Sequence, residues 1–365
     1  METELFYRLA LDHIDGCGRA TIKEMLRHAG SAENVFRKPE LWRKHLNGKC
    51  ARRINTAITD STRRLVEKEM NAMERHGIKL RNCLDGGYPA RMRRCADAPV
   101  QFFYKGDIDF NSPRTLAVVG TRNATSYGTR CVTKILNDLK GSGITTVSGL
   151  AYGIDTVAHE ESVRLGIPTI AVMGSGFKNI YPSTNKSLAS KILDCGGALV
   201  TEFPFDTGPD RTNFPQRNRI IAGMADAVLV AESGLKGGSI ITAHIAHSYN
   251  RDVFAVPGSI FDATSQGCNN LIRGNVAAAA TSGNDILEMM NWDVAAKERQ
   301  MQLFVELSDE EEFLCSFIRD ESRSIDEISE HCAGFSPSKI AGLLLGLELK
   351  GALTSLPGKH YMANR

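Results

Sequence analysis

Long apolar runs are missing from this 365-residue chain, and without any run of about 18 such residues no membrane-spanning helix is predicted. The nine cysteines include no C-x-x-C pair. Metal ligation and a disulfide framework are therefore poor interpretations, and reduced thiols in a cytoplasmic protein are the expectation. Residues 1–8 also lack the basic-then-apolar pattern of a secretory signal, so no export is expected.

The motifs of common nucleotide-binding and hydrolytic enzymes are absent as well. There is no P-loop, and the first predicted strand is followed by Gly-Thr-Arg at 120–122 instead of a G-x-G-x-x-G turn. Ser148 and Ser175 do not lie in a G-x-S-x-G elbow. His244 and His247 are three residues apart and lack the glutamate of H-E-x-x-H. We therefore predict that the protein is not an enzyme and has no catalytic residues, no metal and no cofactor.

The net charge is only +2, but it is unevenly distributed. Residues 1–110 carry 21 Lys and Arg against 15 Asp and Glu, residues 111–296 carry 15 against 15, and residues 297–365 carry 8 against 12. The neutral central part cannot attract a polyanion by bulk charge. If it binds nucleic acid, it must use a few placed cations together with backbone amides.

Residues 1–75 are predicted to form a small helical domain. Apolar residues over 5–14 lead into a turn that contains Gly16 and Gly18, and a second helical pattern starts at Thr21. This arrangement resembles a helix-hairpin-helix in a SAM-like domain, in which backbone amides of the glycine turn meet a phosphate. An ordinary connection between two packed helices is the alternative.

Residues 76–295 are predicted to form a Rossmann-like, mostly parallel α/β sheet, with short strands over 76–110 as an extension. Stretches of roughly 15 to 25 residues separate most candidate strands, a length that suits parallel crossovers. The strands are continuous apolar runs, as expected where helices cover both faces of a sheet. The candidates are Leu116–Val119, Thr145–Val147, Thr169–Met173, Leu199–Thr201, Val228–Ala231 and Val253–Val256.

Residues 300–365 are predicted to form a winged-helix-like domain. Ser308 precedes four acidic residues, which is a typical helix start, and helical patterns follow over 325–332 and 339–350. A hairpin is expected over 354–362, with Pro-Gly in its middle. Because its acidic residues outnumber its basic ones, we expect this domain to mediate protein contacts or regulation, or to be a structural appendage, and not to be a main nucleic-acid site.

The carboxyl ends of the predicted parallel strands share one edge of the sheet, where open α/β folds bind ligands. Glycines in the loops at this edge let backbone amides and helix N-termini approach an anion. Arginine suits phosphate because its planar fork bonds two oxygens. Any single loop of this kind could be a simple tight turn, but five on one edge, four of them with a cation, indicate a polyanion site. Its predicted residues are Gly120, Thr121, Arg122, Ser148, Gly149, Gly174, Gly176, Lys178, Arg217, Asn218, Arg219, Lys236, Gly237, Gly238 and Ser239.

Two of these arginines are expected to have different roles. Arg217 and Arg219 are two residues apart at a predicted helix start, so their side chains point in different directions. We expect Arg217 to join Arg122 and the two lysines in a phosphate track. Arg219 instead holds its own loop through a carboxylate such as Glu202 or Asp155.

A series of strings follows in order along the central segment. They are Val118–Arg122, Ser148–Asp155, Tyr181-Pro182 with Asn185, Phe214–Gly223, Gly238–Ala243, Val253–Gly258, and Ser265 and Gly267 with Leu271-Ile272. Together these strings closely resemble the DNA-processing protein A family, DprA, also called Smf. They span the whole predicted Rossmann-like domain, whereas the first and third domains match the family only in kind.

The resemblance implies a bacterial cytoplasmic protein without catalytic turnover. It implies single-stranded DNA binding, protection of incoming DNA, a homodimer, and loading of the RecA recombinase during natural transformation. Two departures stand out. Where the family often has Gly-Leu-Asp, this chain has Gly-Phe-Lys at 176–178, so a base replaces an acid and either strengthens phosphate binding or alters a salt bridge. The family's Ser-Gly-Ser is replaced by Lys-Gly-Gly-Ser at 236–239.

Two other functions stay open. Related Rossmann-like enzymes hydrolyse nucleotide monophosphates with a P-G-G-x-G-T-x-x-E loop, which residues 236–243 resemble superficially. The terminal glutamate, which would act as the acid or base, is missing. The other alternative is a protein scaffold in which the glycine-rich edge serves only packing.

Overall fold

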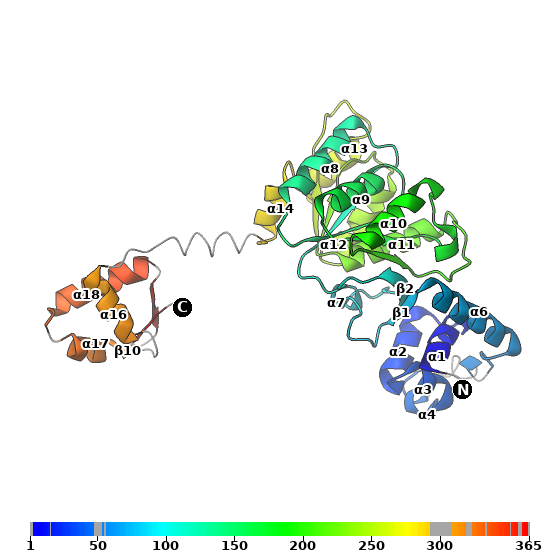
Figure 1. Ribbon diagram of the computed structural model, residues 1–365, viewed down its shortest axis with the longest axis horizontal. Helices are drawn as coiled ribbons and strands as arrows, with labels where there is room; N and C mark the ends of the chain where they lie inside the picture. Colours follow the sequence, from blue (N-terminus) through cyan, green and yellow to red (C-terminus); the bar gives the residue numbers. More distant parts are fainter. Residues whose placement is uncertain are drawn as a thin grey trace. The chain divides into compact units, whose positions relative to one another are not determined.

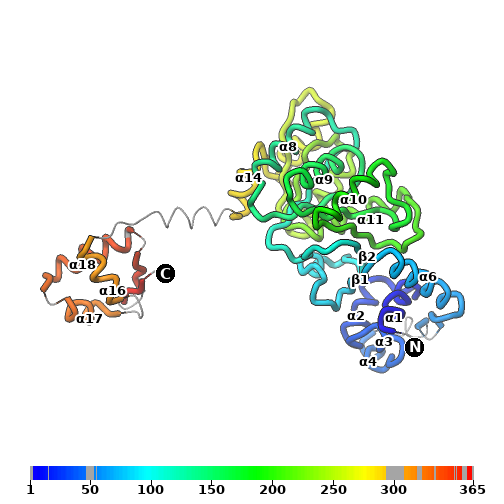
Figure 2. The backbone as a smooth tube through the Cα atoms, viewed as in Figure 1, coloured from blue at the N-terminus to red at the C-terminus, as the bar shows by residue number. Residues whose placement is uncertain are grey.

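The computed structural model describes residues 3–14, 16–46, 53–54, 56–292, 308–318, 323–332, 334–350, 352–356 and 360–363. The chain forms two compact units, Met1–Trp292 and Asp293–Arg365 (Figure 1, Figure 2). Among the described residues, no helix is both long and apolar enough to cross a membrane. The larger unit carries every residue of the predicted site.

A nine-stranded sheet forms the centre of the larger unit, with the strand order β1-β2-β6-β5-β4-β3-β7-β8-β9. The strands from β6 to β9 in that order run parallel, while β2 pairs antiparallel with β6 and β1 pairs antiparallel with β2. The mostly parallel α/β fold predicted from the sequence is confirmed. The strands are β1 (Lys79–Asn82), β2 (Gln101–Gly106), β3 (Thr115–Val119), β4 (Thr145–Ser148), β5 (Thr169–Val172), β6 (Ala198–Thr201), β7 (Ala227–Val230), β8 (Asp252–Ala255) and β9 (Ala278–Ala279).

Helices cover both faces of this sheet (Figure 1). One face shares apolar clusters with α8 (Ser126–Asp138), α9 (Ile154–Leu165), α10 (Lys186–Asp194) and α14 (Gly283–Met289). The other face packs on α7 (Ala90–Arg93), α11 (Asn213–Met224), α12 (Gly238–Ser248) and α13 (Gln266–Arg273). Alternate strand residues serve the two faces, since Val118 belongs to the first core and Val119 to the second. Burial on both sides explains the continuous apolar runs.

The helical part predicted for residues 1–75 is present and packs directly on the antiparallel extension of the sheet. Its core surrounds Trp42 and is completed by Phe103 of β2. Arg8 forms an ion pair with Asp85 (2.8 Å) and its carbonyl accepts a hydrogen bond from Gln101 Nε2 (2.9 Å). These contacts join the two parts into one compact unit. The helices are α1 (Glu4–Ala10), the short 3₁₀ helix η1 (Leu11–His13), α2 (Arg19–Ala29), α3 (Ala32–Arg37), α4 (Glu40–Arg43) and α6 (Asp60–His76).

The smaller unit has three helices and a three-stranded sheet of order β10-β12-β11 among its described residues. Its elements confirm the predicted winged-helix architecture. Both cations of its longest helix and its C-cap are engaged, because Lys339 pairs with Glu310 (2.6 Å) and the C-cap residue Lys350 with Glu311 (2.7 Å). The elements are α16 (Asp309–Ile318), β10 (Arg323–Ser324), α17 (Ile325–His331), α18 (Pro337–Leu349), β11 (Leu353–Leu356) and β12 (His360–Ala363).

Candidate functional site

The candidate site lies where the strand order of the sheet reverses. The chain continues from β3 to β4 on one side, while β7 flanks β3 on the other, so the loops after β3 and β7 diverge and leave a crevice. A cavity of about 770 Å³ lies there. Its lining includes residues 120–122 after β3, residues 237–239 at the start of α12, and residues 214, 215, 217 and 218 at the start of α11. Open α/β sheets bind their ligands at this position.

Backbone hydrogen bonds fasten the loops around the cavity to one another. The amide of Thr121 donates to the carbonyl of Glu232 (2.8 Å) and joins the ends of β3 and β7. The amide of Ile154 donates to the carbonyl of Thr121 (3.1 Å) and brings in the loop after β4. Gly153 has a φ of 74°, and a Cβ there would lie 2.3 Å from the carbonyl oxygen of Thr121. A side chain at this position would therefore separate the two loops.

The loop after β4 also contains a residue in an uncommon conformation. Leu150 has a φ of 56°, in the left-handed region that non-glycine residues rarely adopt. Its side chain is fully buried in an apolar cluster with Met173, and its carbonyl accepts a hydrogen bond from Asn185 Nδ2 (3.0 Å). Such conformations persist only where the surroundings enforce them, and they concentrate at functional sites. The strained residue immediately precedes Ala151, which lines the cavity.

Helix α12 points its N-terminus into the cavity. Its N-cap is Gly237, which supplies no side-chain cap, so the first backbone amides of the helix are open to an anion. Nothing lies within 4 Å of the position that a Cβ on Gly238 would take, whereas Ser239 is buried and its Oγ bonds Ser233 Oγ (2.8 Å). The helix N-terminus thus offers amides and a partial positive charge to a ligand.

Three aromatic rings, two exposed and one half-buried, lie in a row beside the cavity, and we call them the aromatic row: Tyr152, Tyr181 and Phe214. Tyr152 and Tyr181 are 43% and 41% exposed and meet edge to face, with ring centroids 6.4 Å apart. Tyr181 in turn lies 5.8 Å from Phe214. The guanidinium carbon of the exposed Arg122 lies 4.9 Å from the centroid of the Phe214 ring. A cation beside exposed rings can bind a phosphate while a base stacks on a ring face.

Arg217 lies in the floor of the cavity and is only 3% exposed. Its Nη1 donates to the carbonyls of Gly149 and Val172, and its Nε donates to Asn218 Oδ1 (3.2 Å). Burial lowers the pKa of Arg217 to about 10, an effect that the neighbouring Asp155 opposes. Burial likewise raises the pKa of Asp155, and Arg217 opposes that shift. The guanidinium therefore links the ends of β4 and β5 at the floor of the cavity.

Arg219 makes the contact with Glu202 that its position predicted. Its Nη2 pairs with Glu202 Oε2, and its Nη1 donates to the carbonyl of Asp97 (2.5 Å). The same carboxylate pairs with Arg19 (2.9 Å). Arg219 thus faces away from Arg217 and links α11 to the loop after β6 and to α2, as expected from its two-residue spacing.

Neither predicted lysine belongs to the lining of the cavity. Lys178 is exposed and its Nζ lies 2.9 Å from Asp206 Oδ1, so the base that replaces the family's usual acid forms a salt bridge. Lys236 is exposed in the loop before Gly237 and has no recorded ion-pair partner among the residues that the structure describes. The four cations of the predicted phosphate track therefore do not share one cavity.

The glycines after β5 pack the loops. Gly176 is buried, and a Cβ there would lie 2.1 Å from the carbonyl oxygen of Pro204. The lining of the cavity includes Gly120, Thr121, Arg122, Arg217, Asn218, Gly237, Gly238 and Ser239. The other predicted residues, Ser148, Gly149, Gly174, Gly176, Lys178, Arg219 and Lys236, lie outside that lining.

Arg211 and the aromatic row are not among the site residues predicted from the sequence. Arg211 is exposed and lines the cavity from the segment before α11. Tyr152 and Tyr181 lie in loops after strands at the carboxyl edge, which is the signal that could have identified them, because solvent-facing aromatic residues in such loops often contact ligands. Phe214, in the first turn of α11, carries no comparable signal.

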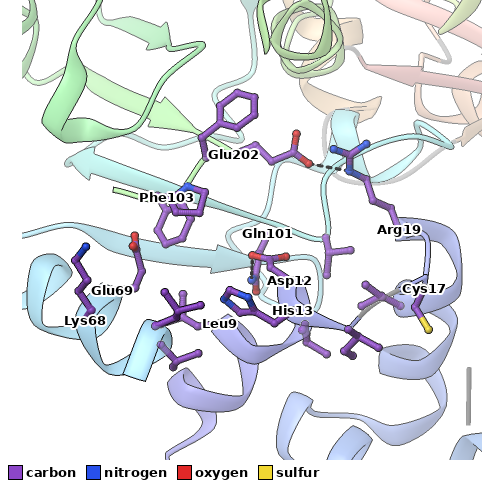
Figure 3. A pocket seen from close by; sticks show the side chains of 18 of the residues that line it. Leu9, Asp12, His13, Cys17, Arg19, Lys68, Glu69, Gln101, Phe103 and Glu202 are labelled. Atoms are coloured by element: carbon purple, nitrogen blue, oxygen red, sulfur yellow. Dashed lines mark hydrogen bonds and ion pairs between the residues drawn. The ribbon is translucent and has the colours of Figure 1, made fainter. Parts of the chain in front are cut away.

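A second cavity, of about 520 Å³, lies between the N-terminal helices and the sheet extension (Figure 3). Its walls are largely apolar, but the carboxylates of Asp12, Glu69 and Glu202 also line it. Arg19, the cation after the glycine turn, reaches across to Glu202 (Figure 3). These carboxylates would repel a phosphate. The phosphate contact expected of the glycine turn stays a prediction.

Asp12 is expected to make the stability of the protein vary with pH between about pH 4 and pH 6. Gln101 Nε2 donates to Asp12 Oδ2 (2.9 Å), and desolvation in the cavity raises the pKa of Asp12 to about 6. The folded state therefore binds this proton more tightly than the unfolded chain, and the resulting stability is present below about pH 4 and lost as the pH rises through about 6. Asp12→Asn, which keeps an acceptor for Gln101, should remove that loss.

The test compares melting curves of the two proteins from about pH 4 to pH 7. We expect the Tm of Asp12→Asn to gain on that of the unsubstituted protein as the pH rises. Asp12 keeps part of its surface exposed, so its desolvation is incomplete and the gain should be small. A difference in Tm that stays constant over this range would contradict the raised pKa.

Family models match both units of the chain. A model described as DNA recombination-mediator protein A matches residues 79–291, and a DprA winged helix domain matches residues 302–359. Protein Smf of Escherichia coli is 37% identical over 286 residues, which cover 76% of this chain and 75% of that protein. DNA processing protein DprA of Streptococcus pneumoniae is 43% identical over 204 residues, covering 56% of this chain and 71% of that protein.

Solved structures share the fold. DNA processing protein A from Streptococcus pneumoniae aligns with a TM-score of 0.66 and 33% identity, covering 79% of this chain and 98% of that one. DNA processing protein A from Helicobacter pylori, described for its single-stranded DNA binding mode, aligns with a TM-score of 0.53 and 25% identity, covering 59% and 96%. The first family model covers more than half of the chain and includes every loop of the site, and the chain therefore belongs to the DNA-processing protein A family of DNA recombination mediators.

Proposed function

We propose that this protein binds single-stranded DNA at the cavity between β3 and β7. The observation that carries the proposal is the convergence of exposed Arg122, the uncapped N-terminus of α12 and the aromatic row on one crevice. Arginine and free amides are phosphate-binding groups, and aromatic rings stack bases irrespective of sequence. The Helicobacter pylori relative, whose description names single-stranded DNA binding, supports the same assignment.

A single strand fits these features better than a duplex does. Tyr152 and Tyr181 can stack on a base only if that base is unpaired and turned out of a helix. Phosphate and stacking contacts carry little sequence information, so the preference for particular sequences should be weak. Within this proposal Arg122 and Arg211 contact the strand, and buried Arg217 supports the floor.

Fluorescence anisotropy with labelled oligonucleotides tests this proposal. Single strands of about twenty nucleotides and matched duplexes are titrated with protein over a range of salt concentrations. We expect tighter binding to the single strand, similar affinity for unrelated sequences, and a salt slope of about 0.7 for each phosphate contacted. Equal affinity for the matched duplex would refute the proposal.

We further propose a cellular role for this binding, which the resemblance to the family supports. The protein protects single-stranded DNA that enters the cytoplasm and loads the RecA recombinase onto it, acting as a homodimer. No catalytic step is included. The alternative of a nucleotide hydrolase predicts that the purified protein releases free base from nucleoside monophosphates, which a chromatographic assay would detect.

The winged-helix unit is assigned to protein contacts within this proposal. The cations of α18 and of its C-cap are held by Glu310 and Glu311, so this helix presents little free positive charge to a phosphate backbone. Nucleic-acid affinity depends on such free cations. The assignment agrees with the excess of acidic residues in this part of the chain.

A further inference from the structure

A stripe of cations runs along the solvent face of α6. Three of its four residues are cations and one is an amide, and their intervals of four, three and four residues place them on one side of the helix: Arg64, Lys68, Asn71 and Arg75. Arg64 and Arg75 are eleven residues apart, or about 16 Å along the axis. Both are exposed, and neither has a recorded ion-pair partner in the described parts of the chain. The stripe accounts for part of the positive excess in residues 1–110.

This stripe forms one wall of a groove of about 610 Å³, and the other wall contains Lys178, Phe205 and Asp206. We call it the α6 groove. Its acids are Asp206, which pairs with both Lys68 (2.5 Å) and Lys178 (2.9 Å), and Glu67. Four Lys and Arg side chains thus face two carboxylates, and the two arginines at the ends are free to meet another anion.

The α6 groove also contains an aromatic pair. The ring of His76 stacks on that of Phe205, with centroids 4.7 Å apart and an interplanar angle of 23°. His76 is exposed at the end of α6, so its outer face is open to solvent. Cations interleaved with a stacked ring are the combination by which proteins hold single-stranded nucleic acid.

The loops after β5 and β6 contribute residues both to the α6 groove and to the cavity between β3 and β7, and we call these loops the ridge. The two loops are bonded together, with the amide of Lys178 donating to the carbonyl of Phe205 (3.1 Å) and the amide of Gly176 to that of Thr207 (2.9 Å). Lys178 lines the groove, and Tyr181 lines the cavity. Lys178 and Tyr181 are three residues apart, so their Cα atoms lie at most about 11 Å from each other. The adjoining edges of the two sites are therefore within a few nucleotides of each other.

We propose that the α6 groove is a second contact for the same single strand, which leaves the cavity past Tyr181, crosses the ridge and follows the cation stripe of α6. The inference rests on the proposed function and adds the N-terminal helices to the DNA path. An acidic protein segment is the competing occupant of a basic groove. Continuity with the cavity, the linear spacing of the cations and the open aromatic ring favour the nucleic acid.

The dependence of affinity on strand length tests this path. Strands of about three nucleotides can fill only the cavity, whereas strands of about twenty reach both sites. The double variant Arg64→Ala/Arg75→Ala should bind the short strand as well as the unsubstituted protein does. It should bind the long strand about tenfold more weakly, with a salt slope lower by about 1.4, because two phosphate contacts are lost.

The matched control is Arg27→Ala/Arg164→Ala, which removes two exposed arginines from α2 and α9. It should leave both affinities and the salt slope unchanged, and melting curves establish that both double variants are folded. Long-strand affinity and slope equal to those of the unsubstituted protein would overturn the inference. If the Arg64→Ala/Arg75→Ala variant keeps its DNA affinity but loses binding to polyglutamate, the groove takes an acidic protein and the inference is also overturned.

A substitution with the opposite effect completes the test. Asp206→Asn releases Lys68 and Lys178 from their shared carboxylate, so long strands should bind a few-fold more tightly while short strands bind as before. Unchanged or weaker long-strand binding by this variant would count against the path. Failure of the proposed function gives a different result, because the unsubstituted protein would then bind neither length of strand.

Discussion

Replacing Arg122 with alanine should weaken single-strand binding by about 1–3 kcal/mol while leaving the protein folded. The side chain is exposed at the switch point of the sheet, beside the open N-terminus of α12. Its loss removes a charge-assisted contact with phosphate, so the salt slope should also fall by about 0.7. Short and long strands should be affected alike, because both occupy this cavity. Anisotropy titrations at several salt concentrations measure both quantities.

Arg122→Lys separates the charge of this residue from its shape. Lysine keeps the positive charge but has neither the planar fork nor the flat face that lies 4.9 Å from the Phe214 ring centroid. We expect the salt slope of Arg122→Lys to match that of the unsubstituted protein. Its affinity should lie between those of Arg122→Ala and the unsubstituted protein. Arg164→Ala is the control for loss of an exposed arginine elsewhere. Unchanged affinity and slope in Arg122→Ala would exclude Arg122 from the binding site.

The fold was largely predictable because its strands are short apolar runs that end in glycine-rich turns. Each of the six predicted strands lies within one residue of an observed one. Burial on both faces produces such runs, and parallel crossovers set their spacing. β9 could not be recognised, because Ala278–Ala279 is too short for an apolar pattern. The packing of the N-terminal helices on β2 depends on contacts distant in sequence, such as Arg8 with Asp85.

The site could be predicted only in part, from the rule that open α/β sheets bind ligands at the carboxyl ends of their strands. That rule placed residues 120–122 and 237–239 together, because both follow strands that flank the switch point. It could not show that Lys178 turns toward Asp206, since that pair depends on how the loops after β5 and β6 pack. The aromatic row likewise draws its rings from three separate segments.

For Arg217, helical spacing predicted the direction of the side chain but not its burial. The two-residue interval correctly indicated that Arg217 and Arg219 point in different directions. It did not indicate that both side chains would be buried, because α11 has the sheet on one side and packed elements on the other. A buried arginine needs partners for its donors, and the carbonyls of Gly149 and Val172 supply them.

Arg217→Ala is therefore expected to act on stability, and to lower the free energy of unfolding by about 3–5 kcal/mol. The substitution removes the donor that the carbonyls of Gly149 and Val172 share and leaves the carboxylate of Asp155 without its neighbouring cation. Whole domains are stable by only about 5–15 kcal/mol, so a loss of this size is large. Denaturant unfolding of the variant and the unsubstituted protein, with equal m-values, measures it.

A second substitution identifies the cause of that loss. Asp155→Asn in the Arg217→Ala background removes the uncompensated charge, so the double variant should regain part of the lost stability, in a double-mutant cycle with favourable coupling. Arg217→Lys keeps a charge but has fewer donors, so its free energy of unfolding should lie between those of Arg217→Ala and the unsubstituted protein. If Arg217 contacted phosphate directly, Arg217→Ala would keep its unfolding free energy and lose about 0.7 of the salt slope instead. The buried guanidinium predicts the reverse: a less stable protein whose folded fraction still shows the full salt dependence carried by Arg122.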